Sequence, residues 1–217
     1  MTGTLLVIRG NSASGKSTTA VTVQRRFAHG TCAVVSQDVV RRNIVREPDE
    51  PAAFNIDLIE QIAGLCLARG MVVIVEGILD ANRYGAMLER LAGTVDSALF
   101  YSFDLSFAET LTRHAGRPQS ATILPEQMAD WYHGWQPLRF VDEIRIDAAW
   151  TLDSLSDRIY HDIQRWPVPS LRRREDETAG KIGDQVEENG GGGLPTNQCV
   201  SHGPGSPGTV PGGSSDR

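Results

Sequence analysis

Several features that would define other classes of protein are absent from the sequence. None of its apolar runs approaches the roughly 20 residues needed to span a membrane, and its first residues lack a basic stretch ahead of a long apolar core. The three cysteines, Cys32, Cys66 and Cys199, form no C-x-x-C pair. This spacing indicates neither a disulfide framework nor a zinc site. We therefore expect a cytoplasmic protein that does not associate with a membrane.

Positive charge is also scarce. The 217 residues include 21 lysines and arginines against 27 aspartates and glutamates, which gives a net charge of -6 at pH 7. Proteins that bind long nucleic acids usually carry a strongly basic face. A long nucleic acid is therefore not the expected partner, although a short 5′ end remains compatible with this charge. The length and composition suit one sizeable core and one catalytic domain.

A phosphate-binding loop is the most informative feature present. Residues 10–17 read Gly-Asn-Ser-Ala-Ser-Gly-Lys-Ser and fit the P-loop (Walker A) pattern G-x-x-x-x-G-K-[ST]. An apolar run at 4–8 precedes them and a helical pattern at 18–27 follows, which is the strand–loop–helix context of a P-loop. The backbone N–H groups of such a loop, together with the positive end of the helix dipole, bind polyphosphate.

The polar residues of this loop have expected roles. Lys16 is expected to contact the β- and γ-phosphates, and the hydroxyl of Ser17, rather than that of Thr18, is expected to coordinate Mg²⁺. The sequence thus predicts a polyphosphate group and Mg²⁺ as ligands. The predicted nucleotide-binding residues are Gly10, Asn11, Ser12, Ala13, Ser14, Gly15, Lys16, Ser17 and Thr18.

Short apolar runs alternate with helical patterns along the chain. The strand candidates lie at 5–8, 32–35, 71–75, 98–103 and 144–146. This alternation predicts an α/β, three-layer P-loop NTPase fold, with a five-stranded parallel sheet, helices on both faces and a small lid. The run at 71–75 has no polar alternation, so we expect it to be a central strand covered on both faces.

Two helices have local signals of their own. Ser106 and Glu109 have the spacing of a capping box just before a helical stretch. A longer helix is predicted earlier in the chain from apolar residues at helical spacing. These residues are Phe54, Leu58, Ile62 and Leu65.

Composition changes after about residue 166. Residues 167–217 are rich in glycine, proline, serine and charged residues, and they include a four-glycine run at 190–193. Such a segment cannot bury enough apolar surface to offset the entropy lost on ordering. We therefore divide the chain into a catalytic domain at 1–166 and a disordered tail at 167–217.

Carboxylates follow three further strands at their carboxyl ends, where ligands bind in doubly wound sheets. Asp38 follows the second strand, Glu76 the third and Asp104 the fourth. Because Ser106 and a helix start come directly after Asp104, turn chemistry explains that residue better than catalysis. The sequence has no N-K-x-D segment, and Val75-Glu76-Gly77 stands where a motor would carry an Asp-Glu pair. A GTPase and an AAA-type motor are therefore disfavoured.

Together these features resemble the small P-loop kinases, a group that includes chloramphenicol phosphotransferase, zeta toxins, polynucleotide 5′-kinases, gluconate kinase and the nucleoside monophosphate kinases. The resemblance covers roughly residues 2–164. It rests on the P-loop, on Ser-Gln-Asp-Val-Val-Arg-Arg at 36–42, on the strand end at 72–77 and on Arg-His-Ala-Gly-Arg-Pro at 113–118. It implies transfer of the γ-phosphate of ATP to an acceptor hydroxyl, with Mg²⁺.

The resemblance also implies roles within the 36–42 segment. Asp38 matches the aspartate that follows the second strand in the polynucleotide and chloramphenicol kinases, so it is the candidate base for the acceptor's proton. Arg41 matches the polynucleotide kinase arginine that steadies the acceptor or its phosphate. Alternatively, Asp38 is the N-cap of the helix that follows it. We expect Arg42 on the solvent-exposed surface.

Glu76 and two arginines complete the predicted site. Glu76 lies where these kinases place a second acidic group, which holds Mg²⁺ through water or orients the acceptor. The alternative is a buried carboxylate bonded to backbone N–H groups. Arg113 and Arg117 are four residues apart, share a helix face and resemble lid arginines that close over the phosphates. The alternative is a pair of surface arginines on an ordinary helix.

The acceptor pocket has weaker signals. Aromatic residues after the lid could offer ring faces to an acceptor, although core packing explains each of them better. They are Trp131, Tyr132, Trp135 and Trp150. In the loop after Glu76, Asp80, Asn82 and Arg83 could read acceptor hydroxyls.

The acceptor therefore stays open among three hypotheses. The acidic net charge favours a small metabolite, nucleoside or antibiotic. The spacing of Asp38 and Arg41 keeps a polynucleotide 5′-hydroxyl as an alternative. The third hypothesis is a non-catalytic nucleotide-binding regulatory module, and ATP turnover without any acceptor would separate it from the other two.

Overall fold

A computed structural model describes residues 3–116 and 124–165, which all belong to one compact unit. The predicted lid residue Arg117 and the predicted tail at 167–217 lie outside the described residues. Within these two stretches, no helix combines the length and the apolar character that crossing a bilayer requires.

The centre of the fold is a parallel sheet of five strands, in the order β2-β3-β1-β4-β5. The strands are β1 (Thr4–Gly10), β2 (Cys32–Ser36), β3 (Val72–Gly77), β4 (Ser97–Phe103) and β5 (Ile144–Ile146). They coincide with the five predicted strands within two residues at each end. The prediction of an α/β fold with a five-stranded parallel sheet is confirmed.

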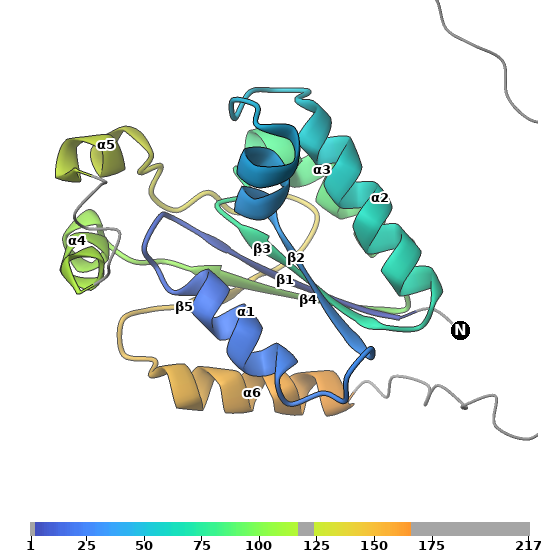
Figure 1. Ribbon diagram of the computed structural model, residues 1–217. Helices are drawn as coiled ribbons and strands as arrows, with labels where there is room; N and C mark the ends of the chain where they lie inside the picture. The colour runs from blue at the N-terminus through green and yellow to red at the C-terminus, as the bar shows by residue number, and fades with distance from the viewer. Residues whose placement is uncertain (1–2, 117–123, 166–217) are drawn as a thin grey trace, which may run out of the picture. The chain divides into compact units, whose positions relative to one another are not determined.

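Helices cover both faces of the sheet (Figure 1). One face carries α1 (Lys16–Gln24) and α6 (Leu152–Arg165), and the other carries α2 (Phe54–Ala68) and α3 (Ala81–Ala92). Three shorter elements stand beyond the carboxyl ends of the strands. They are the π-helix η1 (Val39–Val45), α4 (Phe107–Ala115) and α5 (Pro125–Asp130).

Side-chain alternation along the strands divides the interior into two cores. In β1, Leu5 and Val7 enter the core under α2 and α3, whereas Leu6 and Ile8 enter the core under α1 and α6. All six residues of β3 are buried, so the prediction of a strand covered on both faces is confirmed.

The helix predicted from its apolar spacing is present as α2, but a different stripe of that helix is buried. Ile59 and Ala63 are fully buried and Ile56 is nearly so, whereas Phe54 and Leu65 are 59% and 63% exposed. The predicted capping box at the start of α4 is confirmed. The Ser106 hydroxyl accepts a hydrogen bond from the Glu109 N–H, and the Glu109 carboxylate accepts one from the Ser106 N–H.

A buried ion pair fastens the end of β1 to the segment that leads into β5. Arg9 Nη1 lies 2.9 Å from Glu143 Oε2, and the two side chains are 4% and 1% exposed. Arg9 also donates to the carbonyl oxygens of Leu79 at 3.2 Å and Gln136 at 2.6 Å. The pair therefore joins three segments that border the carboxyl end of the sheet.

Replacing Arg9 with methionine should lower the free energy of unfolding by about 3–5 kcal/mol, because the Glu143 carboxylate would be left buried without its counter-charge. Urea denaturation measures the change. The control is Arg90→Met in α3, since Arg90 pairs with Glu60 on the surface, where its side chain is 56% exposed. That loss should stay below about 1 kcal/mol. Equal losses in the two variants would contradict the role assigned to Arg9.

Candidate active site

The loop between β1 and α1 has the geometry of a phosphate cradle. Gly10 and Gly15 have φ angles of 137° and 110°, and Ala13 has a φ of 61°. A Cβ on Gly10 would lie 2.7 Å from the carbonyl oxygen of Phe103, so both the backbone angle and the close approach of β4 require glycine there. The α1 helix begins at Lys16, which places the positive end of its dipole at the loop.

Lys16 lies inside this loop. Its side chain is buried, and Nζ donates to the carbonyl oxygen of Asn11 at 2.6 Å and to Ser14 Oγ at 3.3 Å. Its ammonium group therefore stays within the hollow that the loop encloses, at the position where phosphate oxygens would replace these partners.

The Asn11 side chain faces away from this hollow, toward the segment after α5. Asn11 Oδ1 accepts from the His133 N–H at 2.9 Å, and Nδ2 donates to the carbonyl oxygen of Gly134 at 3.1 Å. A phosphate contact from Asn11 would therefore come from its backbone. Its side chain ties the P-loop to the segment that carries Trp131 and His133.

Ser17 and Glu76 meet across the hollow. The Ser17 hydroxyl donates to Glu76 Oε2 at 2.9 Å, and Glu76 is 3% exposed at the end of β3. Within the described residues, the only hydrogen bond of the Glu76 carboxylate comes from this hydroxyl. The alternative prediction required hydrogen bonds from backbone N–H groups instead.

These oxygen donors suit Mg²⁺, which binds proteins through one or two carboxylates and completes its shell with phosphate oxygens and water. Among the described residues, no three His, Cys, Asp or Glu side chains gather closely enough to hold a metal by themselves. An ion beside Ser17 and Glu76 would therefore depend on the phosphates of the nucleotide.

Asp38 lies at the start of η1, but its side chain accepts no capping hydrogen bond. Instead, Oδ1 contacts Arg42 Nε at 3.0 Å and Arg41 Nη2 at 3.3 Å. The Asp38 side chain is 60% exposed, so an acceptor hydroxyl can reach it. The alternative role as a helix cap is therefore not what the structure shows.

Arg113 of α4 lies over the P-loop. Its Nη1 donates to the carbonyl oxygen of Ser14 at 2.6 Å, and the same nitrogen would lie 3.6 Å from a Cβ on Gly15. A surface arginine on an ordinary helix would have no such contact. Its predicted partner in the lid, Arg117, lies outside the described residues.

Three hollows lie in a row around the P-loop. The middle one, of about 90 Å³, is lined by Lys16, Ser17, Asp38 and Glu76. These residues were predicted to contact the β- and γ-phosphates, the metal and the acceptor's proton. On one side it shares Gly15 with a hollow of about 240 Å³. On the other it shares Arg42, Ile78 and Trp131 with a pocket of about 470 Å³.

The smaller flanking hollow suits the base and sugar of a nucleotide. It lies between the P-loop, Arg113 of α4 and the start of α6, and Trp150 and Thr151 contribute to its wall. Trp150, considered in the sequence as a residue of the acceptor pocket, is therefore on the opposite side of the P-loop from that pocket.

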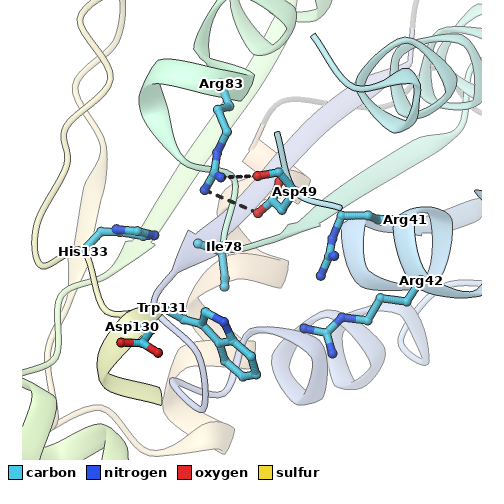
Figure 2. A pocket seen from close by; sticks show the side chains of 8 residues that line it. All are labelled: Arg41, Arg42, Asp49, Ile78, Arg83, Asp130, Trp131 and His133. Carbon is cyan, nitrogen blue, oxygen red and sulfur yellow. Dashed lines mark hydrogen bonds and ion pairs between the residues drawn. The ribbon is translucent and has the colours of Figure 1, made fainter. Parts of the chain in front are cut away.

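The larger pocket lies beside Asp38 and is shown in Figure 2. Its walls come from η1, from the loop before α2, from the residue after β3, from α3, from the end of α5 and from the segment that follows α5. Its lining residues are Arg41, Arg42, Asp49, Ile78, Arg83, Asp130, Trp131 and His133.

The other residues proposed for the acceptor have different positions. Tyr132 donates to the carbonyl oxygen of Leu105 at 3.0 Å, and the Trp135 ring lies under the Arg145 guanidinium at 4.6 Å. Asp80 accepts from backbone N–H groups as the N-cap of α3. Of the loop residues 80–83 named from the sequence, only Arg83 lines the pocket.

Arg42, Asp49 and His133 line the pocket but were not predicted to do so. Arg42 is exposed, as expected from the sequence, but it also borders the pocket. No motif marks Asp49 or His133, because their positions follow from how loops fold over the sheet rather than from any local pattern.

A hydrogen-bond network under the pocket fixes its inner wall. The Tyr84 hydroxyl is bonded to Gln37 Nε2 at 2.8 Å, to Asp49 Oδ1 at 2.9 Å and to Asn55 Oδ1 at 2.9 Å. Burial, with the Asp49 charge as a second cause, raises the pKa of Tyr84. The phenol therefore stays protonated and can donate to Asp49.

Gly77, at the end of β3, leaves room for Gln37. A Cβ at this position would lie 2.5 Å from Gln37 Cβ and would also overlap Gln37 Oε1. Gln37 is buried and precedes Asp38. A side chain at position 77 would therefore displace the segment that presents Asp38.

The Gly77→Ala variant should lose about 1–3 kcal/mol of stability through overpacking, and its transfer rate should fall because Asp38 moves. Denaturation and steady-state kinetics measure the two effects. In the Gly64→Ala control in α2, the new Cβ meets nothing within 4 Å, and alanine favours a helix by about 1 kcal/mol over glycine. A Gly77→Ala protein as stable and active as this control would refute the packing argument.

The chain matches known proteins in its structure only. No protein-family model matches the chain, and no curated protein matches it either.

Several solved structures share the fold. The APS kinase of Mycobacterium tuberculosis, solved in complex with AMPPNP and APS, is 18% identical with a TM-score of 0.60, covering 76% of this chain and 98% of that one. A gluconokinase from Sinorhizobium meliloti is 17% identical with a TM-score of 0.52, covering 75% and 93%. A sugar kinase from Janibacter sp. is 19% identical with a TM-score of 0.55, covering 74% and 95%.

These structural similarities establish the fold class of the chain. The chain has the three-layer α/β fold of small P-loop kinases, and the prediction of that fold class is confirmed. At these identities the likeness extends to the fold and not to the substrate.

Proposed function

We propose that the protein is an ATP-dependent phosphotransferase that moves the γ-phosphate of ATP to a hydroxyl of a small molecule. The observation that carries this proposal is the arrangement of the three hollows. The phosphate hollow lies between a hollow for the nucleotide base and a pocket for an acceptor. Asp38 lines the phosphate hollow and contacts Arg42, which that hollow shares with the acceptor pocket. The pocket volume of about 470 Å³ suits a single metabolite-sized molecule.

The fold comparisons support the same assignment. The APS kinase structure holds AMPPNP and APS, and the other two neighbours are named as a gluconokinase and a sugar kinase. ATP is therefore the proposed donor for this chain, and an alcohol the size of a single metabolite is the proposed acceptor.

The residues of the hollow perform the reaction as follows. Backbone N–H groups of residues 10–17 and the Lys16 ammonium hold the phosphates and stabilise the charge that spreads over the transferring group. Asp38 takes the proton of the acceptor hydroxyl. The bond between the acceptor oxygen and the γ-phosphorus forms, and the bond between the γ-phosphorus and the oxygen that bridges it to the β-phosphorus breaks. The leaving group is ADP, and no covalent enzyme intermediate forms.

Arg113 contributes positive charge from the lid side, next to Ser14. Mg²⁺, held by Ser17 and by Glu76 directly or through water, would neutralise phosphate charge when bound. Glu76 itself keeps the Ser17 hydroxyl oriented toward the hollow through their 2.9 Å hydrogen bond.

Two alternatives remain as proposals. A polynucleotide 5′-hydroxyl is one alternative acceptor, because Arg41, which lines the large pocket, lies 3.3 Å from Asp38 of the phosphate hollow. The second is a nucleotide-binding regulatory module that has no small acceptor.

The test is transfer from γ-labelled ATP with Mg²⁺ to a panel of sugars, nucleosides, hydroxyl-bearing antibiotics and 5′-hydroxyl oligonucleotides, alongside a reaction without acceptor. Label on a small molecule is the expected result. Label on the oligonucleotides alone would select the second acceptor class. Label found only in free phosphate, at the same rate with and without acceptors, would contradict a phosphotransferase.

A further inference from the structure

The large pocket is lined by more positive than negative charge on its inner surface. Its guanidinium groups belong to Arg41, Arg42 and Arg83, and its carboxylates to Asp49 and Asp130. Asp130 is exposed, and in Figure 2 its carboxylate points away from the three guanidinium groups. Asp49 is therefore the carboxylate that faces them inside the pocket.

Arg41 has few good partners for a side chain that is 14% exposed. Its Nε is buried without a hydrogen bond. Its other two nitrogens make only long contacts, 3.4 Å from Nη1 to the Glu47 carbonyl oxygen and 3.3 Å from Nη2 to Asp38 Oδ1. Buried polar groups are normally hydrogen-bonded. A ligand group in the pocket with several oxygens that accept hydrogen bonds would give Arg41 Nε a partner.

Arg83 enters the pocket from the opposite wall, on the first turn of α3 (Figure 2). Asp49 accepts from it through its carbonyl oxygen at 2.5 Å and its carboxylate at 3.3 Å. That carboxylate also accepts from the Tyr84 hydroxyl. The Arg83 Nε has no hydrogen bond and lies 3.8 Å from Asp80.

Asp38 offsets this charge only in part. Its carboxylate is divided between Arg41 and Arg42, and it lines the neighbouring phosphate hollow and not this pocket. In the proposed reaction Asp38 becomes neutral when it takes the acceptor's proton. Arg42, which also lies 5.7 Å from the centroid of the Trp131 ring, then loses that counter-charge.

We infer that the acceptor is an alcohol that carries a second, anionic group, either a phosphate or a carboxylate, and that Arg41 and Arg83 bind this group. Guanidinium groups match the geometry of both anions through paired N–H donors. The anion would occupy the pocket while the hydroxyl reaches Asp38. The inference rests on the proposed function, because it concerns the acceptor of that reaction.

Matched pairs of probes test the inference: ribose 5-phosphate with ribose, adenosine 5′-monophosphate with adenosine, and gluconate with glucose. Binding is measured by calorimetry on the full chain, with the P-loop filled by a non-hydrolysable ATP analogue and Mg²⁺ so that anions cannot enter it. In at least one pair, the anionic member should bind about 10- to 100-fold more tightly, as expected for hydrogen bonds to a charged group.

The arginine variants show where the preference arises. Arg41→Gln and Arg83→Gln should each remove most of the preference for the anionic member. The control is Arg90→Gln, which changes an exposed residue farther along the same helix as Arg83. This variant should retain the preference. The readout is a ratio between two probes, so a general loss of stability would not imitate the effect. If one of the two variants fails to fold, the other still gives the ratio.

The outcomes separate this inference from the proposed function. Anionic members that bind no more tightly than their neutral partners in every pair would overturn the inference, as would a preference that both pocket variants retain. Label transfer to a neutral alcohol alone would overturn it while leaving the phosphotransferase intact. Arginine-dependent binding of an anion without any transfer would support an anion site at Arg41 and Arg83, but it would count against the phosphotransferase and so against the anion as an acceptor.

Discussion

Lys16→Ala is expected to lower the rate of phosphate transfer by at least about 10²- to 10³-fold, the range seen when one preorganised transition-state donor is removed. The lysine is buried within the loop, with its ammonium group 2.6 Å from the carbonyl oxygen of Asn11. No other lysine lies in residues 3–116 and 124–165, so no second lysine there could take over the contact proposed for Lys16 with the β- and γ-phosphates.

Steady-state kinetics with saturating ATP measure this loss, and a melting temperature shows whether the variant is folded. Arg25→Ala is the control, because Arg25 is an exposed cation at the opposite end of the same helix. It should keep the wild-type rate. A folded Lys16→Ala protein with wild-type transfer would mean that residues 10–17 do not hold the phosphates.

Asp38→Asn should lower kcat by about 10² to 10⁴-fold, the usual contribution of a general base, while ATP binding stays unchanged. The amide has nearly the shape of the carboxylate but cannot accept the proton. Because Asp38 borders the phosphate hollow and lies outside the hollow assigned to the base, the loss should appear in kcat and not in nucleotide affinity.

Asp104→Asn is the matched control for this variant. Asp104 also follows a strand of the sheet, but it pairs with Arg145 on the surface side of β5 and lines none of the three hollows described above. Its substitution should leave kcat unaltered. If Asp38→Asn also kept the wild-type kcat, the base would have to be Glu76, the other carboxylate of the phosphate hollow.

The sequence was sufficient for the fold because its signals are local. Each strand is a short apolar run, and the P-loop is a pattern whose glycines are required by backbone angles that other residues avoid, as Gly10 shows. The α2 helix marks the limit of such signals. Its apolar residues outnumber those that one face can bury, so spacing alone predicted the helix but not which stripe faces the core.

The site was predictable only where a strand end fixes a residue's place. Lys16 and Asp38 follow β1 and β2, Glu76 lies at the end of β3, and the structure brings the three into one hollow. Trp150 follows β5, and the sequence does not show that β5 lies beyond β4, at the edge opposite β2. That strand order places Trp150 near the nucleotide side and away from the acceptor pocket.

Arg42, Asp49 and His133 were the least predictable part of the pocket, since Arg41 and Arg83 were already proposed for the acceptor from the sequence. Arg42 is an exposed residue within the short π-helix η1, and it borders the pocket because Trp131, in the segment after α5, lies beside it. Asn11 holds that segment to the P-loop through His133 and Gly134. Because these partners are more than 120 residues apart in the sequence, no local sequence pattern predicts their contact.

The most direct measurement follows the γ-phosphate of labelled ATP in a reaction that contains the whole protein, Mg²⁺ and an unfractionated pool of small metabolites, with Lys16→Ala protein in parallel. The account predicts a labelled organic phosphate ester that forms with the wild-type protein and is absent with the variant. Label that remains in ATP, or that appears only as inorganic phosphate regardless of the metabolite pool, would contradict it.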